Sequence, residues 1–323
     1  MQTRLVGRRP VVAPDDLVAS LAPPAHFAHA TFASYVPDAG YPSQSTALVE
    51  ARAFAKGAQG KRRRSGGSGL YLDGGFGVGK THLLTAMAHE VGEGAAFGTF
   101  LEYTSLVGAL GFVPARDALA RFQLVCIDEF ELDDPGDTLL MARLMRELAD
   151  AGVALAATSN TPPGALGEGR FAADDFRREI QSLAGRFAVQ TIDGPDYRHR
   201  ESVGESQPVS DAEVERAASA PGGVVERWDE LIDDLAHVHP SRYGAYIEGI
   251  RVLGIAGVAP LKDQNQALRL VMLVDRLYDA DVRVVASGVR WSQVFAADML
   301  AGGYRKKYLR ALSRLAAMTA GTD

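Results

Sequence analysis

A glycine-rich turn between an apolar stretch and an amphipathic stretch is the pattern in this chain best suited to chemistry. The segment LYLDGGFGVGKTHLL, residues 70–84, matches the spacing G-x-x-x-x-G-K-T through Gly74, Gly79, Lys80 and Thr81. Glycines let consecutive backbone N–H groups point at one phosphate, and the N-terminus of the following helix adds partial positive charge. We therefore predict a phosphate-binding loop. Its predicted nucleotide contacts are Gly74, Gly75, Phe76, Gly77, Val78, Gly79, Lys80, Thr81 and His82.

Two carboxylates follow about fifty residues later, at the end of the apolar run LVCIDEF. A lysine in the loop, Lys80, suits the β- and γ-phosphates of ATP, and the Thr81 hydroxyl suits Mg²⁺. Asp128 is the predicted second Mg²⁺ ligand, and Glu129 is the predicted base that polarises the attacking water. An isolated Asp-Glu pair is often a solvated turn, but behind a phosphate loop it predicts hydrolysis. ATP and Mg²⁺ are thus the predicted cofactors.

A polar strand end and several arginines complete the candidate site. The run VALAATSN ends in Asn160, whose amide could sense the γ-phosphate, although an ordinary turn is the alternative. Arg170 and Arg186 are candidates for an arginine that a neighbouring subunit contributes to the phosphate, and a surface ion pair is the alternative for each. Arg310 and Arg314 lie on a basic helical stretch, and either one is a candidate sensor arginine within the same subunit.

Short apolar runs alternate with amphipathic stretches around these motifs. Such alternation is typical of an α/β fold, here of the P-loop NTPase type, with a mostly parallel sheet between two helical layers. The predicted strands are 69–73, 97–102, 123–128, 153–158 and 187–192, and the predicted helices are 43–58, 79–91, 104–110, 137–151 and 172–184.

The flanking segments suggest four parts. We expect an N-terminal arm and helix over 1–64, with one helical turn from Asp15, and the ATPase core over 65–195. A polar, turn-rich linker is predicted over 196–222, followed by a C-terminal α/β extension over 223–323 that ends in a helix. Residues 251–288 repeat a strand–helix–strand rhythm, and an extension of the first sheet is one way to place that unit.

Composition and charge limit the class of protein and the cellular compartment to which this chain can belong. The 323 residues carry a formal net charge of −6, which argues against a surface built to neutralise nucleic-acid backbones. The single cysteine, Cys126, excludes an intrachain disulfide. No apolar run approaches the ~18 residues of a membrane span, and the first residues lack a secretory core. We expect a soluble cytoplasmic protein without a structural metal, because no Cys, His and acid set has zinc spacing.

Longer stretches carry a family resemblance. Three motifs are more specific for one family than the phosphate loop is: IDEF with the following D-x-x-D, TSN-x-P-P, and RALSRL. Together with GLYLDGGFGVGKTHLL, they resemble the ZapE family of bacterial cell-division ATPases, which is similar to the mitochondrial AFG-type ATPases. The order of loop, acidic pair and asparagine is that of AAA+ ATPases. The resemblance spans about residues 40–318 and assigns the loop, the acidic pair and the Asn160 sensor as above.

What the resemblance implies is a cytoplasmic, nucleotide-dependent homo-oligomer that is recruited to the division ring and remodels FtsZ filaments with ATP. Arg170 matches a family arginine that precedes a phenylalanine, which favours it over Arg186. The stretch EYTSLVGALGF departs from the basic, aromatic segment of the family, which puts a partner contact there in question.

The sequence is compatible with two alternative functions. An ATP-gated loader that grips single-stranded DNA would use the basic run 61–64 and the tail helix, but aromatic residues are not interleaved with those charges. A nucleotide-sensing scaffold that hydrolyses slowly has less need of Glu129 as a base.

Overall fold

The structure is a computed structural model that describes residues 4–60, 69–75, 77–130, 135–163, 166, 185–195 and 207–319. The chain divides into two compact units. One comprises Ala13–Glu201, and the other comprises Met1–Val12 together with Ser202–Asp323.

Five parallel strands form the sheet of the first unit, in the order β2-β3-β4-β1-β5. They are β1 (Gly69–Gly74), β2 (Ala95–Thr99), β3 (Leu124–Asp128), β4 (Ala154–Ser159) and β5 (Phe187–Ile192). Every residue of β3 and β4 is buried, because helices cover both faces of a parallel sheet. This order sets β4 between β3 and β1, so the carboxyl ends of these three strands lie side by side.

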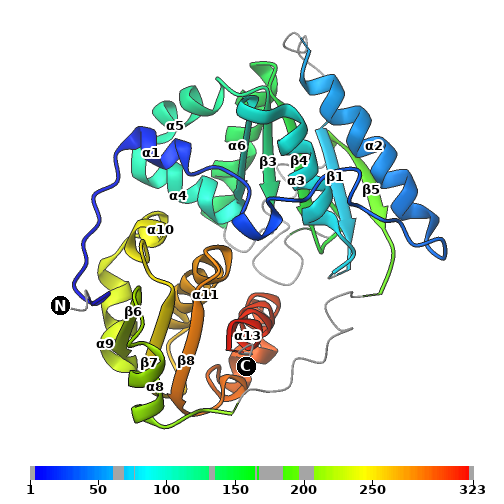
Figure 1. Cartoon of the computed structure of the whole chain (residues 1–323). Helices are drawn as coiled ribbons and strands as arrows, with labels where there is room; N and C mark the ends of the chain where they lie inside the picture. Colours follow the sequence, from blue (N-terminus) through cyan, green and yellow to red (C-terminus); the bar gives the residue numbers. More distant parts are fainter. Residues whose placement is uncertain are drawn as a thin grey trace. The chain divides into compact units, whose positions relative to one another are not determined.

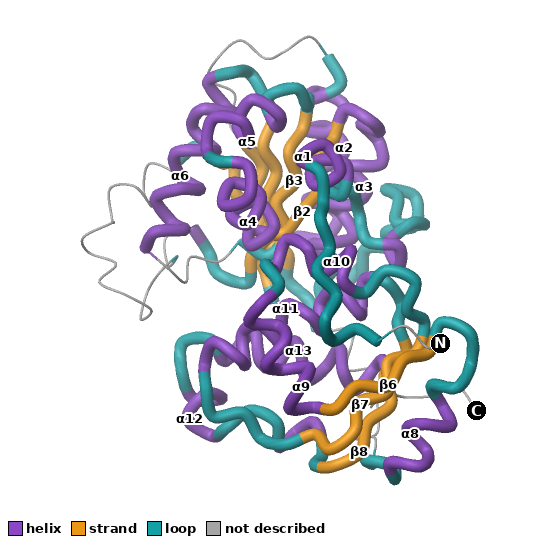
Figure 2. The backbone as a smooth tube through the Cα atoms, turned by 90° about the vertical axis from the view of Figure 1, so that its left-hand side faces the viewer, coloured by secondary structure: helices purple, strands orange, loops and turns teal. Residues whose placement is uncertain are grey.

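Helices cover the two faces of this sheet (Figure 2). They are α1 (Pro14–Ala19), α2 (Pro42–Ala58), α3 (Lys80–Val91), α4 (Phe100–Leu110), α5 (Phe112–Leu119) and α6 (Pro135–Asp150), with 3-10 turns η1 (Ala25–Phe27) and η2 (Gly92–Gly94). On one face, α2 and α3 bury Ala47, Ala51 and Leu84 against Leu72 and Cys126 of the sheet. The opposite layer contains α4, α5 and α6, which contact one another. The predicted α/β fold with three layers is confirmed.

The boundary between β2 and α4 differs from the expected one. We expected a strand to Glu102 and a helix from Thr104, but β2 ends at Thr99 and α4 begins at Phe100. The reason is a capping box, in which Glu102 N donates to Thr99 Oγ1 at 3.2 Å and Thr99 N donates to Glu102 Oε2 at 2.6 Å. Helix α5 was not expected at all. The helix predicted over 172–184 lies outside the described residues.

The second unit has its own sheet, with parallel strands in the order β6-β7-β8 (Figure 1). The placement of residues 251–288 as an extension of the first sheet, one of the arrangements that the sequence allows, is therefore wrong. The strands are β6 (Gly223–Arg227), β7 (Val252–Val258) and β8 (Arg283–Gly288). The helices are α8 (Asp211–Ala217), α9 (Trp228–Asp234), α10 (Tyr243–Tyr246), α11 (Gln264–Asp279), α12 (Ala297–Ala301) and α13 (Arg305–Thr319), with 3-10 turns η6 (Leu235–His237), η7 (Pro240–Arg242) and η8 (Trp291–Gln293).

Part of the expected linker is folded. Residues 211–217 form α8, and Val214 is fully buried against the second sheet. Glu213 N donates to Ser210 Oγ at 3.3 Å, and Ser210 N donates to Glu213 Oε2 at 2.9 Å. Such capping residues are polar, and they made the helix start resemble a turn-rich linker.

The first described residues do not form a free arm. Leu5 is fully buried in the hydrophobic core of the second unit. The buried carboxylate of Glu226 accepts a hydrogen bond from the Leu5 backbone N–H and another from Val6 N at 3.2 Å. Arg9 pairs with Asp234 at 2.8 Å. These partners lie more than 200 residues away in the sequence, so local composition could not reveal them.

Candidate nucleotide-binding site

The turn between β1 and α3 has the backbone shape of a phosphate-binding loop. Gly74, Gly77 and Gly79 have φ angles of 150°, 69° and 89°, in the left-handed region that favours glycine. A Cβ on Gly74 would lie 2.3 Å from the carbonyl oxygen of Ile192. The first glycine of the motif, Gly74, is therefore required because a side chain would collide with the neighbouring strand. Phe76, also predicted to contact the nucleotide, lies outside the described residues.

The ammonium of Lys80 lies within this turn. Its Nζ donates to Gly74 O at 2.9 Å, to Gly75 O at 2.5 Å and to the side-chain Oδ1 of Asn160 at 2.8 Å. Lys80 is only 8% exposed. A buried cation is costly unless it has strong acceptors, and phosphate oxygens are such acceptors. The loop and its lysine therefore fit a polyphosphate ligand.

Thr81 and Asp128 meet beside the loop. The Thr81 hydroxyl lies 3.1 Å from Oδ1 and 3.2 Å from Oδ2 of Asp128, which is 6% exposed at the end of β3. Mg²⁺ prefers oxygen ligands and is commonly held by one or two carboxylates together with phosphate oxygens and waters. Among the described residues, no group of three or more His, Cys, Asp or Glu could hold a metal by itself. The pair thus fits a nucleotide-bound Mg²⁺.

Glu129 is held in an unusual backbone conformation. Its φ is 54°, which is uncommon for a residue other than glycine. Its N–H donates to Thr158 Oγ1 at 3.1 Å, and the next N–H, of Phe130, donates to Thr158 O at 2.7 Å. The Phe130 ring is buried between Tyr71 and Phe100, with centroid distances of 6.2 and 5.4 Å. The backbone at Glu129, the predicted base, is therefore held by hydrogen bonds at Glu129 itself and at the residue that follows it.

The end of β4 supplies two polar side chains to the site. Asn160 contacts Lys80 as described above, so the predicted sensor and the predicted phosphate ligand lie together. Thr158 donates to Asp128 Oδ1 as well as accepting from Glu129. The sequence pattern indicates Thr158 only as the end of a strand. One sequence signal could have indicated this role. Thr158 is a small polar residue two positions before the predicted sensor, on a strand expected to lie near the acidic pair.

A segment before α2 packs on the loop from outside. The Tyr35 hydroxyl donates to Val78 O at 3.3 Å. His82 Nε2 lies 2.9 Å from Thr31 O and 3.2 Å from Ser34 Oγ. His82, a predicted nucleotide contact, thus has partners within the protein, and its contact with a nucleotide stays a prediction.

The candidate arginines have different positions. Arg170 lies outside the described residues. Arg186 precedes β5, at the end of the sheet opposite to the loop, and its Nη1 lies 3.5 Å from Asp150 Oδ1. In the second unit, Arg310 and Arg314 both pair with Asp275 of α11, Arg310 at 2.7 Å. These observed ion pairs are structural, and the arginine roles toward phosphate stay predictions.

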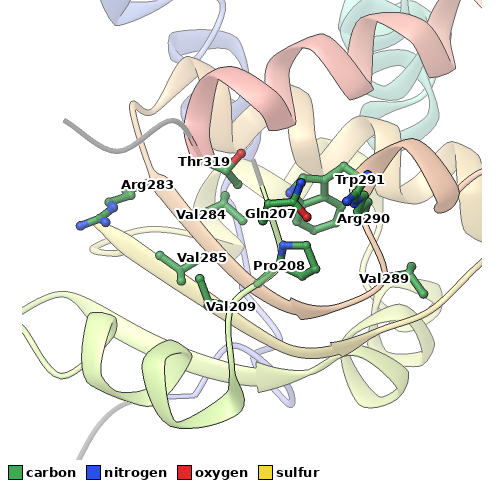
Figure 3. Close-up of a pocket in the computed structure, with 11 residues that line it drawn as sticks. Gln207, Pro208, Val209, Arg283, Val284, Val285, Val289, Arg290, Trp291 and Thr319 are labelled. Atoms are coloured by element: carbon green, nitrogen blue, oxygen red, sulfur yellow. The ribbon is translucent and has the colours of Figure 1, made fainter. Parts of the chain in front are cut away.

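A cavity of about 100 Å³ lies in the second unit beside β8 (Figure 3). Gln207, Pro208 and Arg290 lie next to Trp291, and Arg283 lies on the opposite side of the lining. None of the predicted site residues lines it. Across the ranges that the structure describes, no helix combines the length and the apolar character needed to cross a bilayer.

Comparisons with known proteins identify the family. The model of the AFG1-like ATPase family matches residues 11–236 and 206–322. The cell division protein ZapE of Escherichia coli K12 is 33% identical over 146 residues, which are 41% of this chain and 38% of ZapE. An uncharacterised protein of Schizosaccharomyces pombe is 31% identical over 170 residues, 46% of this chain and 37% of that protein. The matched region thus spans less than two fifths of these relatives.

Among solved structures, domain III of the replication initiation protein DnaA from Thermotoga maritima is similar, with a TM-score of 0.43 and 22% identity over 52% of this chain and 69% of that one. The resemblance to ZapE noted in the sequence is confirmed by the curated relatives. With nearly all of its length matched by the family model, the chain belongs to the AFG1-like ATPase family.

Proposed function

We propose that this protein binds ATP with Mg²⁺ at the β1–α3 loop and hydrolyses the terminal phosphate. One observation carries the proposal. The carboxyl ends of β1, β3 and β4 bring Lys80 against Asn160 at 2.8 Å and Thr81 against Asp128 at 3.1 Å. These are the side chains that a nucleoside triphosphatase needs for phosphate, for metal and for sensing the γ-phosphate.

Each group has a task in this proposal. Lys80 and the backbone N–H groups of the loop hold the β- and γ-phosphates, and Thr81 and Asp128 hold the metal. Bound Mg²⁺ supplies charge neutralisation for the phosphates. Glu129 orients a water molecule and accepts its proton, while Asn160 reports the state of the γ-phosphate through its contact with Lys80. An arginine from a neighbouring subunit, Arg170 or Arg186, completes the site in a nucleotide-dependent homo-oligomer.

The cellular role that we propose is ATP-dependent remodelling of FtsZ filaments at the cytoplasmic division site. Its support is the family membership and the likeness to a relative named as a cell division protein. The remodelling would come from differential binding, in which the ATP-bound and ADP-bound states of the protein bind the filament with different affinities.

Two basic residues of the tail helix, Arg310 and Arg314, lend the loader alternative no support. The side chains of Arg310 and Arg314 are only 13% and 17% exposed and share the carboxylate of Asp275. A largely buried arginine pair whose charge is balanced by a carboxylate contributes little to a nucleic-acid surface. The basic run 61–64 lies outside the described residues.

Sedimentation of FtsZ polymers tests the proposal. Wild-type protein with ATP is expected to reduce the pelleted FtsZ, whereas Lys80→Ala and Glu129→Gln are expected to leave it unchanged. The exposed residues Lys56 and Glu50 of α2 provide matched controls, Lys56→Ala and Glu50→Gln, which should act like the wild type. An equal effect without ATP would contradict the motor role, and salt-sensitive binding of single-stranded DNA with intact filaments would favour a loader.

A further inference from the structure

Thr158 occupies a junction between the two acidic residues of the candidate site. It is 2% exposed and lies in β4, opposite Leu72 of β1. Its hydroxyl donates to Oδ1 of Asp128 and accepts from the backbone N–H of Glu129 at 3.1 Å. A hydroxyl has one hydrogen to donate, so its orientation is fixed by the carboxylate. A single side-chain oxygen therefore connects the predicted metal ligand to the backbone of the predicted base.

The backbone at Glu129 needs such a support. A left-handed φ of 54° is unfavourable for a residue with a Cβ and persists only where the surroundings hold it. Thr158 holds both neighbouring peptides, because its hydroxyl accepts from Glu129 N and its carbonyl accepts from Phe130 N at 2.7 Å. Replacing the side chain removes the first of these bonds and leaves the second in place. The hydroxyl can thus be tested separately from the rest of the turn.

The carboxylate of Asp128 is held from two sides. Thr81 approaches it from α3, at 3.1 Å from Oδ1 and 3.2 Å from Oδ2. Thr158 approaches Oδ1 from the neighbouring strand, so it orients the carboxylate independently of Thr81. Hydrogen bonds to a ligating carboxylate commonly set metal affinity by fixing the direction of its oxygens.

We infer that Thr158 is a positioning residue that couples the metal-binding carboxylate of Asp128 to the backbone of Glu129, and so aligns metal and base. The catalytic part of this inference rests on the proposed function, in which Asp128 binds Mg²⁺ and Glu129 activates water. The structural part, a hydroxyl tether that protects the Glu129 amide, does not depend on ATP.

Thr158→Val tests the tether because valine has nearly the same shape and lacks the hydroxyl. Turnover of ATP is expected to fall about tenfold, because the variant loses a hydrogen bond to a charged group. The Mg²⁺ concentration for half-maximal nucleotide binding is expected to rise about tenfold, as for other residues that support a metal ligand. ATP affinity measured in EDTA should be unchanged, since Thr158 contacts the carboxylate and not the loop lysine in any bond described above.

A second readout needs no nucleotide. In the nucleotide-free protein, hydrogen–deuterium exchange of the peptide that contains the Glu129 amide is expected to be faster in Thr158→Val than in the wild type. Thr158→Ser keeps the hydroxyl, so it should restore slow exchange and most of the turnover. Should Thr158→Val fail to fold, Thr158→Ala removes the same hydroxyl and takes its place in the comparison with Thr158→Ser.

Thr85 of α3 provides the matched control. It is fully buried, and its hydroxyl has no hydrogen-bond partner among the residues that the structure describes. Thr85→Val is expected to leave exchange at Glu129 and the Mg²⁺ dependence at wild-type values. The inference is overturned if Thr158→Val behaves like Thr85→Val in both measurements. If the wild type itself does not hydrolyse ATP, the proposed function fails, while the exchange comparison still decides whether the tether exists.

Discussion

The ammonium of Lys80 and the side-chain oxygen of Asn160 are 2.8 Å apart, although 80 residues separate them in the sequence. One belongs to the helix that follows β1 and the other follows β4. They meet because β1 and β4 are parallel neighbours in register, with Asp73 opposite Ser159. The predicted sensor is thereby in contact with the predicted phosphate ligand.

This contact predicts different outcomes for two substitutions of Asn160. Asn160→Ala removes an acceptor of Lys80 and is expected to lower turnover about tenfold with little change in ATP affinity. Asn160→Asp places a carboxylate beside Lys80, where it competes with the phosphates and should weaken ATP binding about tenfold or more. Calorimetric titration of ATP in the Glu129→Gln background measures both affinities. Tighter ATP binding by Asn160→Asp would contradict the placement of Asn160 at the phosphate.

The loop glycine Gly79 should be far less replaceable than Gly75. A Cβ on Gly79 would lie 2.6 Å from Cε2 of Tyr35, and its φ is 89°. Gly79→Ala is therefore expected to lower the free energy of unfolding by about 1 to 3 kcal/mol. A Cβ on Gly75 meets nothing within 4 Å, so Gly75→Ala is the control for stability. Thermal denaturation without nucleotide compares them, and equal melting temperatures would refute the steric argument.

The buried hydroxyl of Thr85 offers a way to stabilise the first unit. Because this hydroxyl has no partner among the described residues, replacing it with a methyl group removes a desolvation penalty. Thr85→Val is expected to raise the free energy of unfolding by about 1 kcal/mol. Thr85→Ala also removes the hydroxyl but leaves a small cavity, and it should be less stable than Thr85→Val. Chemical denaturation distinguishes them, and a less stable Thr85→Val would show that the hydroxyl is satisfied.

The ion pairs of α13 predict a pH dependence of stability in the second unit. Burial raises the pKa of Asp275, but Arg310 and Arg314 outweigh it, so the pKa in the folded protein lies below its usual value. The ordinary value is about 3.9, so the stabilisation is complete above that pH. It is lost as the pH falls through the lower pKa of the folded state.

Asp275→Asn tests this dependence. At pH 7 it leaves two largely buried guanidinium groups without their carboxylate, which should cost about 3 kcal/mol. The difference in melting temperature from the wild type should shrink as the pH falls below about 4. The exposed residue Asp233 provides the control Asp233→Asn, which should follow the wild type at each pH. A difference that is constant from pH 3 to 7 would be inconsistent with the ion pair as the cause.

Much of the site could be predicted because each of its motifs is a short, local pattern in the sequence. The spacing from Gly74 to Thr81 fixes a turn and a helix start locally, and the apolar run before Asp128 fixes a buried strand. What could not be predicted depends on contacts between distant segments. The contact of Thr158 with Asp128 depends on the pairing of β4 with β3. The partner of Arg310, Asp275, lies 35 residues earlier, on α11.

The same reason explains the differences in the fold. Leu5 is buried in the hydrophobic core of the second unit, where Glu226 accepts a hydrogen bond from its backbone N–H, and nothing in the first residues indicates that partner. The cap residue Ser210 has the composition of a linker and the function of a helix start. Local patterns thus predicted the strands of the first sheet and the strand–helix–strand unit over 251–288 of the second unit. Strand β6, helix α8 and the position of the first residues depended on tertiary contacts.

Phosphate release from Mg²⁺–ATP by the wild type and by Glu129→Gln tests the central claim most directly. Glu129 follows Asp128, the predicted metal ligand, its backbone N–H donates to Thr158, and its carboxylate is the predicted base. Glu129→Gln is expected to bind ATP as well as the wild type and to release phosphate about 100-fold more slowly. Equal rates of phosphate release in the two proteins, or no ATP binding by the wild type, would contradict the account.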